Sequence, residues 1–405
     1  MIDIDVVHHL LQLCPNIRRL ELDHYRKDTY TLEYCNPRLE ALAVTGGFDQ
    51  QLTQSVTMRF RGLRSLTFGK IDGKDSIPLM IEMIQGLPNL DKIGLSGFSP
   101  KLVDEDYAKL IAAGPKGWQQ VELAHVGQTT IAAVAKHSRT LEFLSIRCIS
   151  GFDSRQLVDL LASSPRLRTF RMLTNIFDAK SFVDPDLATT TTMTTTTART
   201  LRPWLCEATL TEFRAHIGDI PRPDLTFDLQ DDLHGNTADK HDRHDEDADD
   251  TDDDGDDEWC APRLREAYPG ESIHLQQQVL ARLGRLRQLR RLQLGLEDLD
   301  AAERDAIKYS ANYQAPFHDW HYQDECLDMT LASGLGQLQS LRQLRYLNIG
   351  RMASRVGPEE VEWMVQHWPQ LETLEGLCAD EEEEAAWQLW VIAPHINTIR
   401  FHRIT

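Results

Sequence analysis

The segment Leu141-Glu142-Phe143-Leu144-Ser145-Ile146 decides the fold of this chain, because its pattern of apolar residues recurs along the whole sequence. An apolar residue is followed by two variable residues, a second apolar residue, one variable residue and a third apolar residue. Twelve segments share this spacing, and they begin at Ile17, Leu39, Leu63, Leu90, Trp118, Leu141, Leu167, Leu210, Leu289, Leu344, Leu371 and Ile396. In the regular parts the period lies in the range of leucine-rich repeats, about 20–29 residues. Such a repeat predicts a solenoid in which each unit packs on its neighbours.

Helices are expected between these segments, where apolar residues recur at i, i+3 and i+4. The predicted helices cover residues 6–14, 77–86, 107–113, 156–162 and 361–367. Proline precedes several of the next segments, where it ends a helix and favours an extended chain. These prolines are Pro15, Pro88, Pro115, Pro165 and Pro369. The sequence therefore predicts an α/β horseshoe of about twelve repeats, with a parallel concave sheet, outer helices and two low-complexity insertions.

Four repeats resemble a known family. They read LLQLCPNIRRLEL (10–22), MIQGLPNLDKIGL (83–95), LLASSPRLRTFRM (160–172) and MVQHWPQLETLEG (364–376), and they look like the cysteine-containing leucine-rich repeats of F-box proteins, which are abundant in fungi. The resemblance implies a leucine-rich-repeat solenoid that recognises substrates for an SCF-type ubiquitin ligase. In that family an F-box precedes the repeats and holds the adaptor. Here the first segment already begins at Ile17, so we expect no F-box in this chain. An Skp1–cullin complex would join only if an F-box is supplied elsewhere, and the alternative is a repeat-only relative.

Three intervals interrupt the period, and they run from Leu167 to Leu210, from Leu210 to Leu289 and from Leu289 to Leu344. The first interval contains a threonine tract at 189–197, and the second contains the acidic run Asp239 to Glu258. Such segments carry too little apolar surface to form a core. The predicted organisation is N-terminal leucine-rich repeats at 1–175, a Thr-rich insertion at 176–208, a repeat strand at 209–218, an acidic disordered insertion at 219–272, and C-terminal leucine-rich repeats at 273–405 with an insertion at about 297–330.

The charge of the chain narrows the class of partner. The formal net charge is −20 over 405 residues, which argues against nucleic-acid and anionic-membrane binding. The N-terminus lacks the pattern of a signal peptide, and no apolar run approaches the roughly 18 residues of a membrane span. The seven cysteines are scattered and include no C-x-x-C pair, which does not suggest a disulfide framework. We therefore expect an intracellular protein, cytoplasmic or nuclear, with no nucleic-acid or membrane partner.

Motifs of catalysis and cofactor binding are missing from the sequence. None of G-x-S-x-G, G-x-x-x-x-G-K-[ST], H-E-x-x-H or G-x-G-x-x-G occurs. Residues 250–255 match the opening of an EF-hand loop, but Ala261 stands where a bidentate glutamate is needed. The histidines and aspartates of 241–245 have no scaffold to fix them as metal ligands. We expect no enzyme activity, cofactor or metal, and we interpret the acidic run as an interaction segment that could also contact the basic stretch at 282–291.

Candidate binding residues lie at the third, fifth and seventh positions of each repeat. These positions alternate away from the apolar ones and project onto the concave face. Equivalent positions of successive repeats form columns, because adjacent strands lie about 4.8 Å apart. The candidates are Phe143, Arg147, Arg171, Glu212, Arg214, His216, Arg291, Gln293, Tyr346, Asn348, Arg400 and His402. Because arginine and aromatic residues dominate interface hot spots, we predict a basic, aromatic patch that binds a protein partner.

The favoured function is therefore a protein–protein recognition scaffold, with substrate recognition for an SCF-type ligase as the version that the resemblance implies. One alternative is a leucine-rich regulator of a small GTPase or a nuclear transport factor, which would also be acidic and intracellular. A stricter period of about 28–29 residues would favour that class. The other alternative is an enzyme.

Overall fold

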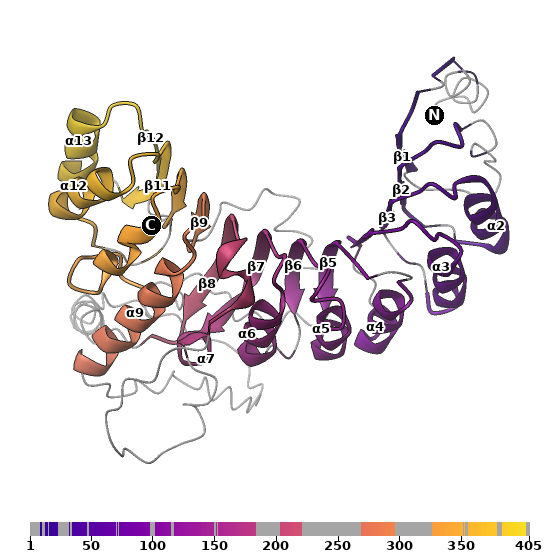
Figure 1. The fold of residues 1–405 in the computed structure, drawn as a ribbon, viewed down its shortest axis with the longest axis horizontal. Coiled ribbons are helices and arrows are strands. Elements are labelled where there is room, and N and C mark those ends of the chain that lie inside the picture. The colour runs from indigo at the N-terminus through magenta and orange to yellow at the C-terminus, as the bar shows by residue number, and fades with distance from the viewer. Residues whose placement is uncertain are drawn as a thin grey trace, which may run out of the picture.

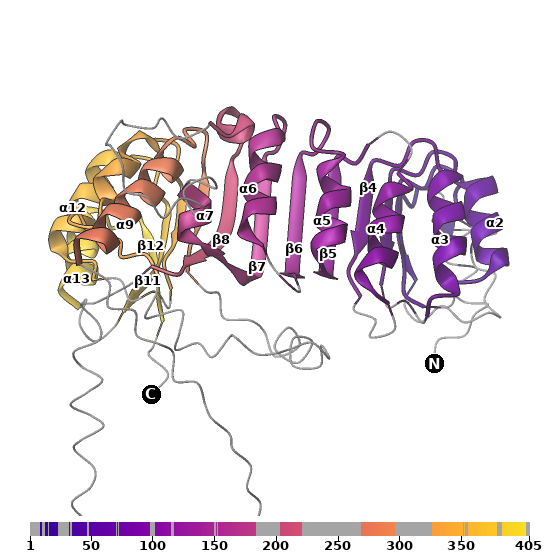
Figure 2. The ribbon, with the colours of Figure 1, turned by 90° about the horizontal axis from the view of Figure 1, so that it is seen from below.

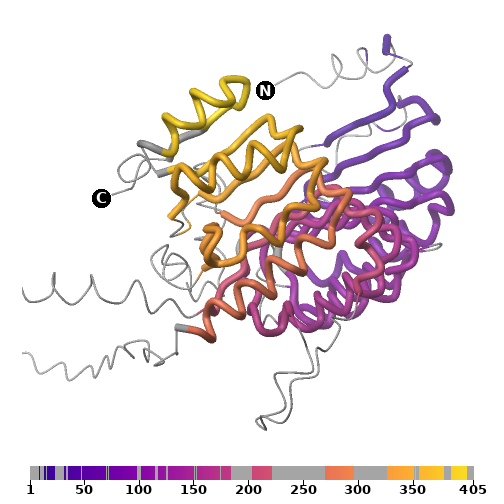
Figure 3. Tube along the Cα trace, turned by 60° about the vertical axis from the view of Figure 1, so that its left-hand side comes forward, coloured from indigo at the N-terminus to yellow at the C-terminus, as the bar shows by residue number. Residues whose placement is uncertain are grey.

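A computed structural model gives the structure of this chain as a curved row of repeats. It describes residues 9, 13–14, 16–22, 32, 35–46, 48–69, 71, 73–97, 102–114, 117–149, 151, 153–183, 203–220, 269–295, 326–350, 352, 355–378 and 383–401. The strands line the inner side of the curve and the helices its outer side (Figure 1). From below, the helices stand next to one another along one side of the sheet (Figure 2). The chain advances along the row one repeat at a time (Figure 3).

A single sheet of twelve parallel strands runs through the described part of the molecule, and its spatial order is the sequence order from β1 to β12. The strands are β1 (Arg19–Leu22), β2 (Ala41–Val44), β3 (Ser65–Phe68), β4 (Lys92–Leu95), β5 (Gln120–Val126), β6 (Phe143–Ile149), β7 (Thr169–Asp178), β8 (Glu212–Gly218), β9 (Arg291–Gln293), β10 (Tyr346–Asn348), β11 (Thr373–Cys378) and β12 (Asn397–Phe401). Each of the twelve predicted segments contributes one strand. The predicted leucine-rich-repeat fold is thus confirmed.

Helices connect most of the strands. They are α2 (Gln50–Arg59), α3 (Ser76–Gln85), α4 (Asp104–Ala112), α5 (Gln128–Ala135), α6 (Ser154–Ser163), α7 (Ala179–Val183), α9 (Pro269–Gly284), α12 (Pro358–His367) and α13 (Glu383–Ile392), with the 3₁₀ turns η3 (Leu205–Ala208) and η4 (Leu335–Ser340). The helices predicted at 77–86, 107–113, 156–162 and 361–367 coincide with α3, α4, α6 and α12. The one predicted at 6–14 lies mostly outside the described residues.

Backbone hydrogen bonds at the second position of each repeat hold neighbouring repeats together. The carbonyl of Arg168 accepts from the amides of Thr211 at 2.8 Å and Glu212 at 3.0 Å. The carbonyl of Arg290 does the same for the next repeat, with amides of that repeat at 2.8 and 3.1 Å. Because this pairing fixes the register, the third, fourth and fifth positions of successive repeats lie next to one another from β1 to β11. The exception is β12, where Thr373 pairs with Asn397, one residue short of the equivalent position.

The core lies between the sheet and the helices and is filled by the apolar positions of the repeat. The fourth-position residues of five consecutive repeats are fully buried, and they are Leu144, Phe170, Phe213, Leu292 and Leu347. Burying one such side chain stabilises the fold by about 1.5–3 kcal/mol. The buried indole of Trp118 has a polar partner, because it donates to the carbonyl of Ile111 at 2.7 Å. Each repeat therefore adds apolar area that only its neighbours cover.

The edges of the predicted insertions belong to the solenoid. Strand β7 continues through residues 176–178 into α7, and η3 lies at 205–208. Phe182 joins these parts, because its ring packs edge-on against Phe177 at 5.7 Å and Trp204 at 5.0 Å. Helix α9 begins at Pro269, inside the segment predicted as acidic insertion. The threonine tract and the acidic run lie outside the described residues.

The long intervals on either side of β9 do not disturb the sheet. Strand β9 pairs directly with β8 and with β10, although both neighbouring segments are far from it in sequence. The interval from Leu289 to Leu344 therefore contributes no additional strand among the residues that the structure describes. Part of it is core, because Cys326, Leu327 and Met329 at its far side are buried.

Candidate functional site

The sheet brings most of the candidate residues into two adjacent columns on strands β6 to β11. The third-position column runs through Phe143, Thr169, Glu212, Arg291, Tyr346 and Thr373, and the fifth-position column runs through Ser145, Arg171, Arg214, Gln293, Asn348 and Glu375. Arg147 lies further along β6 and His216 further along β8. Arg400 belongs to β12, but its side chain and the whole of His402 lie outside the described residues.

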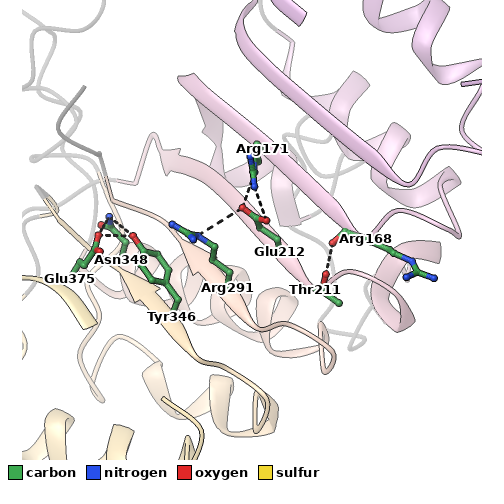
Figure 4. Close-up of polar contacts among 8 residues, drawn as sticks. All are labelled: Arg168, Arg171, Thr211, Glu212, Arg291, Tyr346, Asn348 and Glu375. Carbon is green, nitrogen blue, oxygen red and sulfur yellow. Dashed lines mark hydrogen bonds and ion pairs between the residues drawn. The ribbon is translucent and has the colours of Figure 1, made fainter. Parts of the chain in front are cut away.

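A carboxylate shared by two arginines forms the centre of these columns (Figure 4). Arg171 donates two hydrogen bonds to Glu212, from Nε to Oε1 at 2.8 Å and from Nη2 to Oε2 at 3.1 Å. On the other side, Nε of Arg291 lies 3.9 Å from the same Oε1. The Arg171 and Arg291 side chains are 38% and 42% exposed, whereas that of Glu212 is 16% exposed. The carboxylate thus lies low on the face, and two guanidinium groups are presented beside it.

Each of the two arginines also contacts an aromatic ring. The guanidinium carbon of Arg171 lies 5.4 Å from the ring centroid of Phe143. That of Arg291 lies 3.9 Å from the ring centroid of Tyr346. Both distances are within the range of cation–π attraction, about 6 Å. A ring on one side and a carboxylate on the other therefore hold each guanidinium in place.

Tyr346 extends the contacts to β11 through a buried carboxylate. Its hydroxyl donates to Oε2 of Glu375 at 2.6 Å, and Nδ2 of Asn348 donates to the same oxygen at 2.8 Å. Oδ1 of Asn348 accepts from the amide of Gly350 at 2.8 Å, which fixes the amide orientation. Burial and the hydrogen bond to Glu375 raise the pKa of Tyr346 to about 12. The tyrosine is therefore a protonated donor at any physiological pH.

These contacts form one continuous arrangement across six strands, which we call the concave network. It consists of Phe143, Arg171, Glu212, Arg291, Tyr346, Asn348 and Glu375. Glu375 is not among the residues predicted from the sequence. It is the fifth residue of the repeat that begins at Leu371, so its repeat position assigns it to the fifth-position column.

Three predicted residues lie below the surface of the face. His216 is 2% exposed, and Gln293 and Asn348 are fully buried. Burial, together with the nearby charge of Arg214, lowers the pKa of His216 to about 3, despite a hydrogen bond to the backbone of Gly295. The imidazole is therefore neutral. These side chains support the face from beneath, whereas Arg147 and Arg214 are half-buried within it.

The seventh-position column is interrupted between β7 and β8. Arg171 pairs with Arg214, but the next pair joins Ile176 to His216, so β7 holds extra residues between the two pairs. A regular spacing in sequence does not predict such an irregularity. The extra residues in β7 explain why His216 lies beside Ile176 and is not aligned with the seventh position of the preceding repeat.

Among the described residues, no three His, Cys, Asp or Glu side chains are grouped so that they could hold a metal ion. No helix in the same part of the chain has the length and apolar character required to cross a membrane.

Comparison with known proteins shows similarity at the level of solved structures. No family model matches the chain, and no curated protein matches it. An internalin from Listeria monocytogenes aligns with a TM-score of 0.44 and 10% identity over 99% of this chain and 94% of its own. Rad7, from a complex with Elc1 in yeast, aligns with a TM-score of 0.46 and 14% identity over 98% and 88% of the two chains. A protein from Bacteroides fragilis aligns with a TM-score of 0.25 and 11% identity over 99% and 72%.

Proposed function

We propose that this chain is a protein-recognition scaffold that binds a protein partner on the concave face of β6 to β11. The observation that carries the proposal is the pair Arg171 and Arg291. Each is half-exposed, and each is held between an aromatic ring and the carboxylate of Glu212. Arginine and tyrosine are enriched among interface hot spots. Side chains that are already ordered lose less conformational entropy on binding.

The charge of the face favours an acidic segment on the partner. At the repeat positions that face inward, β6 to β11 carry four arginines, Arg147, Arg171, Arg214 and Arg291, against two glutamates, Glu212 and Glu375. The rest of the chain is acidic, with an overall net charge of −20. An acidic partner segment would be attracted here and repelled elsewhere, and such complementarity fixes where and how a partner docks.

From the resemblance to F-box proteins, we further propose that the bound partner is a substrate for SCF-type ubiquitin ligation. The concave network would then select the substrate. The Skp1–cullin complex would be reached through an F-box outside these 405 residues.

The test of the concave face compares two arginine variants. The double variant R171A/R291A removes both guanidinium groups, whereas R168A removes an arginine from the same repeat. The side chain of Arg168 points away from the network (Figure 4), although its backbone carbonyl contacts the next repeat. We expect affinity capture of the full-length tagged protein, followed by quantitative mass spectrometry, to lose the main companion at least about tenfold with R171A/R291A and not with R168A. Equal capture by R171A/R291A and wild type would refute the proposed face.

The same capture tests the ligase proposal separately. Co-enrichment of an Skp1-type adaptor and a cullin, together with ubiquitylation of the captured partner that R171A/R291A abolishes, would support it. A partner captured through the concave face without adaptor or cullin would refute the ligase role and leave a stand-alone recognition scaffold.

A further inference from the structure

The last helix, α13, exposes large apolar side chains on one face. Trp387, Trp390 and Val391 are 62%, 63% and 53% exposed. Their spacing of i, i+3 and i+4 places them together on the helix surface. The two indole rings already contact each other, with centroids 5.1 Å apart and planes inclined by 33°. An exposed, contiguous group of this kind marks an interaction surface more often than a single exposed apolar residue does.

Packing within the solenoid does not account for this face. The opposite side of α13 is held in the core by Ala385, Ala386 and Leu389, which are 1%, 5% and 1% exposed. The two tryptophans are therefore not needed to anchor the helix.

The preceding helix offers a direct comparison. At its exposed positions α12 carries Glu359, Glu362 and Gln366, and the last two are joined by a hydrogen bond of 3.1 Å. Elsewhere, α2 exposes the single large apolar residue Met58, and α9 exposes Ile273. Among the described helices, an apolar outer face is thus a property of α13, which stands at the end of the row of helices (Figure 1).

We infer that the outer face of α13 is a docking site for an amphipathic helix of a partner protein, with lysine or arginine flanking its apolar face. Helices of this solenoid stack side by side, as α12 does on α13, so a helix is the element that continues the row. Amphipathic helices bind apolar surfaces through anchors spaced i, i+3, i+4 and i+7. This surface lies on the helix side of the molecule and is separate from the concave network on the sheet.

Charge selects a basic partner and argues against a second copy of this chain. Helix α13 begins with two acidic residues, Glu383 and Glu384. The neighbouring helix α12 adds Glu359 and Glu360 in its first turn. A second copy would bring the same acidic residues and another net charge of −20. Basic residues beside the apolar face of a partner helix would instead be attracted.

The experiment uses the full-length protein and a synthetic, fluorescein-labelled helical peptide of about five turns. The peptide has leucines at i, i+3, i+4 and i+7 and lysines on both sides of them. Fluorescence anisotropy measures its binding to wild type, to W387Q/W390Q and to the control M58Q, which removes an exposed apolar residue from α2. We expect W387Q/W390Q to weaken binding at least about tenfold and M58Q to leave it unchanged. Replacing the peptide lysines by glutamates should weaken binding to wild type by a similar factor. All three proteins should unfold at the same temperature, because the substituted side chains are exposed.

Several outcomes would overturn the inference. One is that none of the peptides binds wild type at about 100 µM, a concentration at which even weak specific binding is measurable. Equal binding of the lysine and glutamate peptides would remove the charge selection. A wild-type dimer in sedimentation velocity that W387Q/W390Q dissociates would identify a second copy as the occupant. Binding to phosphatidylcholine vesicles that depends on the two tryptophans would identify a lipid surface.

Discussion

The carboxylate of Asp104 caps a helix of the next repeat, and its removal should weaken the fold at that point. Helix α5 begins after Gly127, a residue with no side chain to serve as its own cap. Asp104, the first residue of α4, accepts from the amides of Gly127 at 2.7 Å, Thr129 at 2.6 Å and Thr130 at 3.2 Å. It also accepts from the hydroxyl of Thr130 at 2.5 Å. A Cβ at Gly127 would lie 2.6 Å from this carboxylate, so glycine is what permits the approach.

The expected cost follows from these contacts. Loss of a capping side chain costs about 0.5–2 kcal/mol, and a negative charge at a helix N-terminus contributes about 0.3–1 kcal/mol. The fully buried Thr130 would keep an unpaired amide after truncation, which adds to the cost. We therefore expect D104A to lower the free energy of unfolding by about 2–3 kcal/mol. D104N keeps an acceptor oxygen but loses the charge, so we expect it to lower the free energy of unfolding by about 1 kcal/mol.

The effect of D104A should depend on pH. Burial alone would raise the pKa of the Asp104 carboxyl, but hydrogen bonds from Thr130, Gly127 and Thr129 hold it below its ordinary value. A carboxyl whose pKa is lower in the folded state stabilises fully above the unfolded pKa of about 3.9. That contribution is lost as the pH falls through the folded pKa. The difference between wild type and D104A should therefore be constant near neutral pH and shrink in acid.

Urea unfolding followed by circular dichroism, together with hydrogen exchange at residues 127–130, measures this effect. Exchange is needed because a solenoid can open locally before it unfolds globally. The matched control is E105A, which removes the exposed acidic side chain that follows Asp104 in the first turn of α4. The reasoning would be refuted if D104A and E105A had the same unfolding midpoint and the same protection at residues 127–130.

Two further predictions concern the concave network. E212A should lower stability by about 1 kcal/mol and weaken partner capture as R171A/R291A does, because both guanidinium groups lose their shared carboxylate. Capture at wild-type level would show that the arginines do not need Glu212 for orientation. Y346F should cost about 1–2 kcal/mol, because the buried Glu375 loses a donor. The pKa of Tyr346 is raised to about 12 in the folded protein. The stabilisation that Tyr346 supplies is therefore full below the unfolded pKa of about 10, and it is lost as the pH rises from there through the folded pKa. Unfolding free energies of wild type and Y346F should therefore converge in strong alkali, and a difference that stays constant there would contradict this assignment.

The repeat pattern was sufficient to predict the strands. The spacing that begins at Leu141 recurs at every strand of the sheet, because a strand buried on one face needs apolar residues in those places. The columns on the concave face followed from the same register. The repeat positions of Phe143, Arg171 and Arg291 alone therefore assign them to neighbouring columns.

The partners within the network could not be predicted, because a column gives neighbours but not rotamers. Sequence spacing did not show that Glu212 joins Arg171 to Arg291, which turns a group of positive charges into a network with an internal counter-charge. Nor did it show that His216 is buried, or that the extra residues in β7 place it beside Ile176. The contact between Phe182 and Trp204 could not be predicted either, because the two residues are far apart in the sequence.

Local packing explains how the concave network can be assembled from such distant parts of the chain. Phe143 and Glu375 lie at opposite ends of the concave network, and two of the long intervals separate β8, β9 and β10 from one another. The register across these strands is nevertheless continuous. Each repeat needs only its neighbours, and closing a longer loop costs little additional entropy. The chain can therefore accept long insertions between neighbouring strands without displacing the residues that form the face.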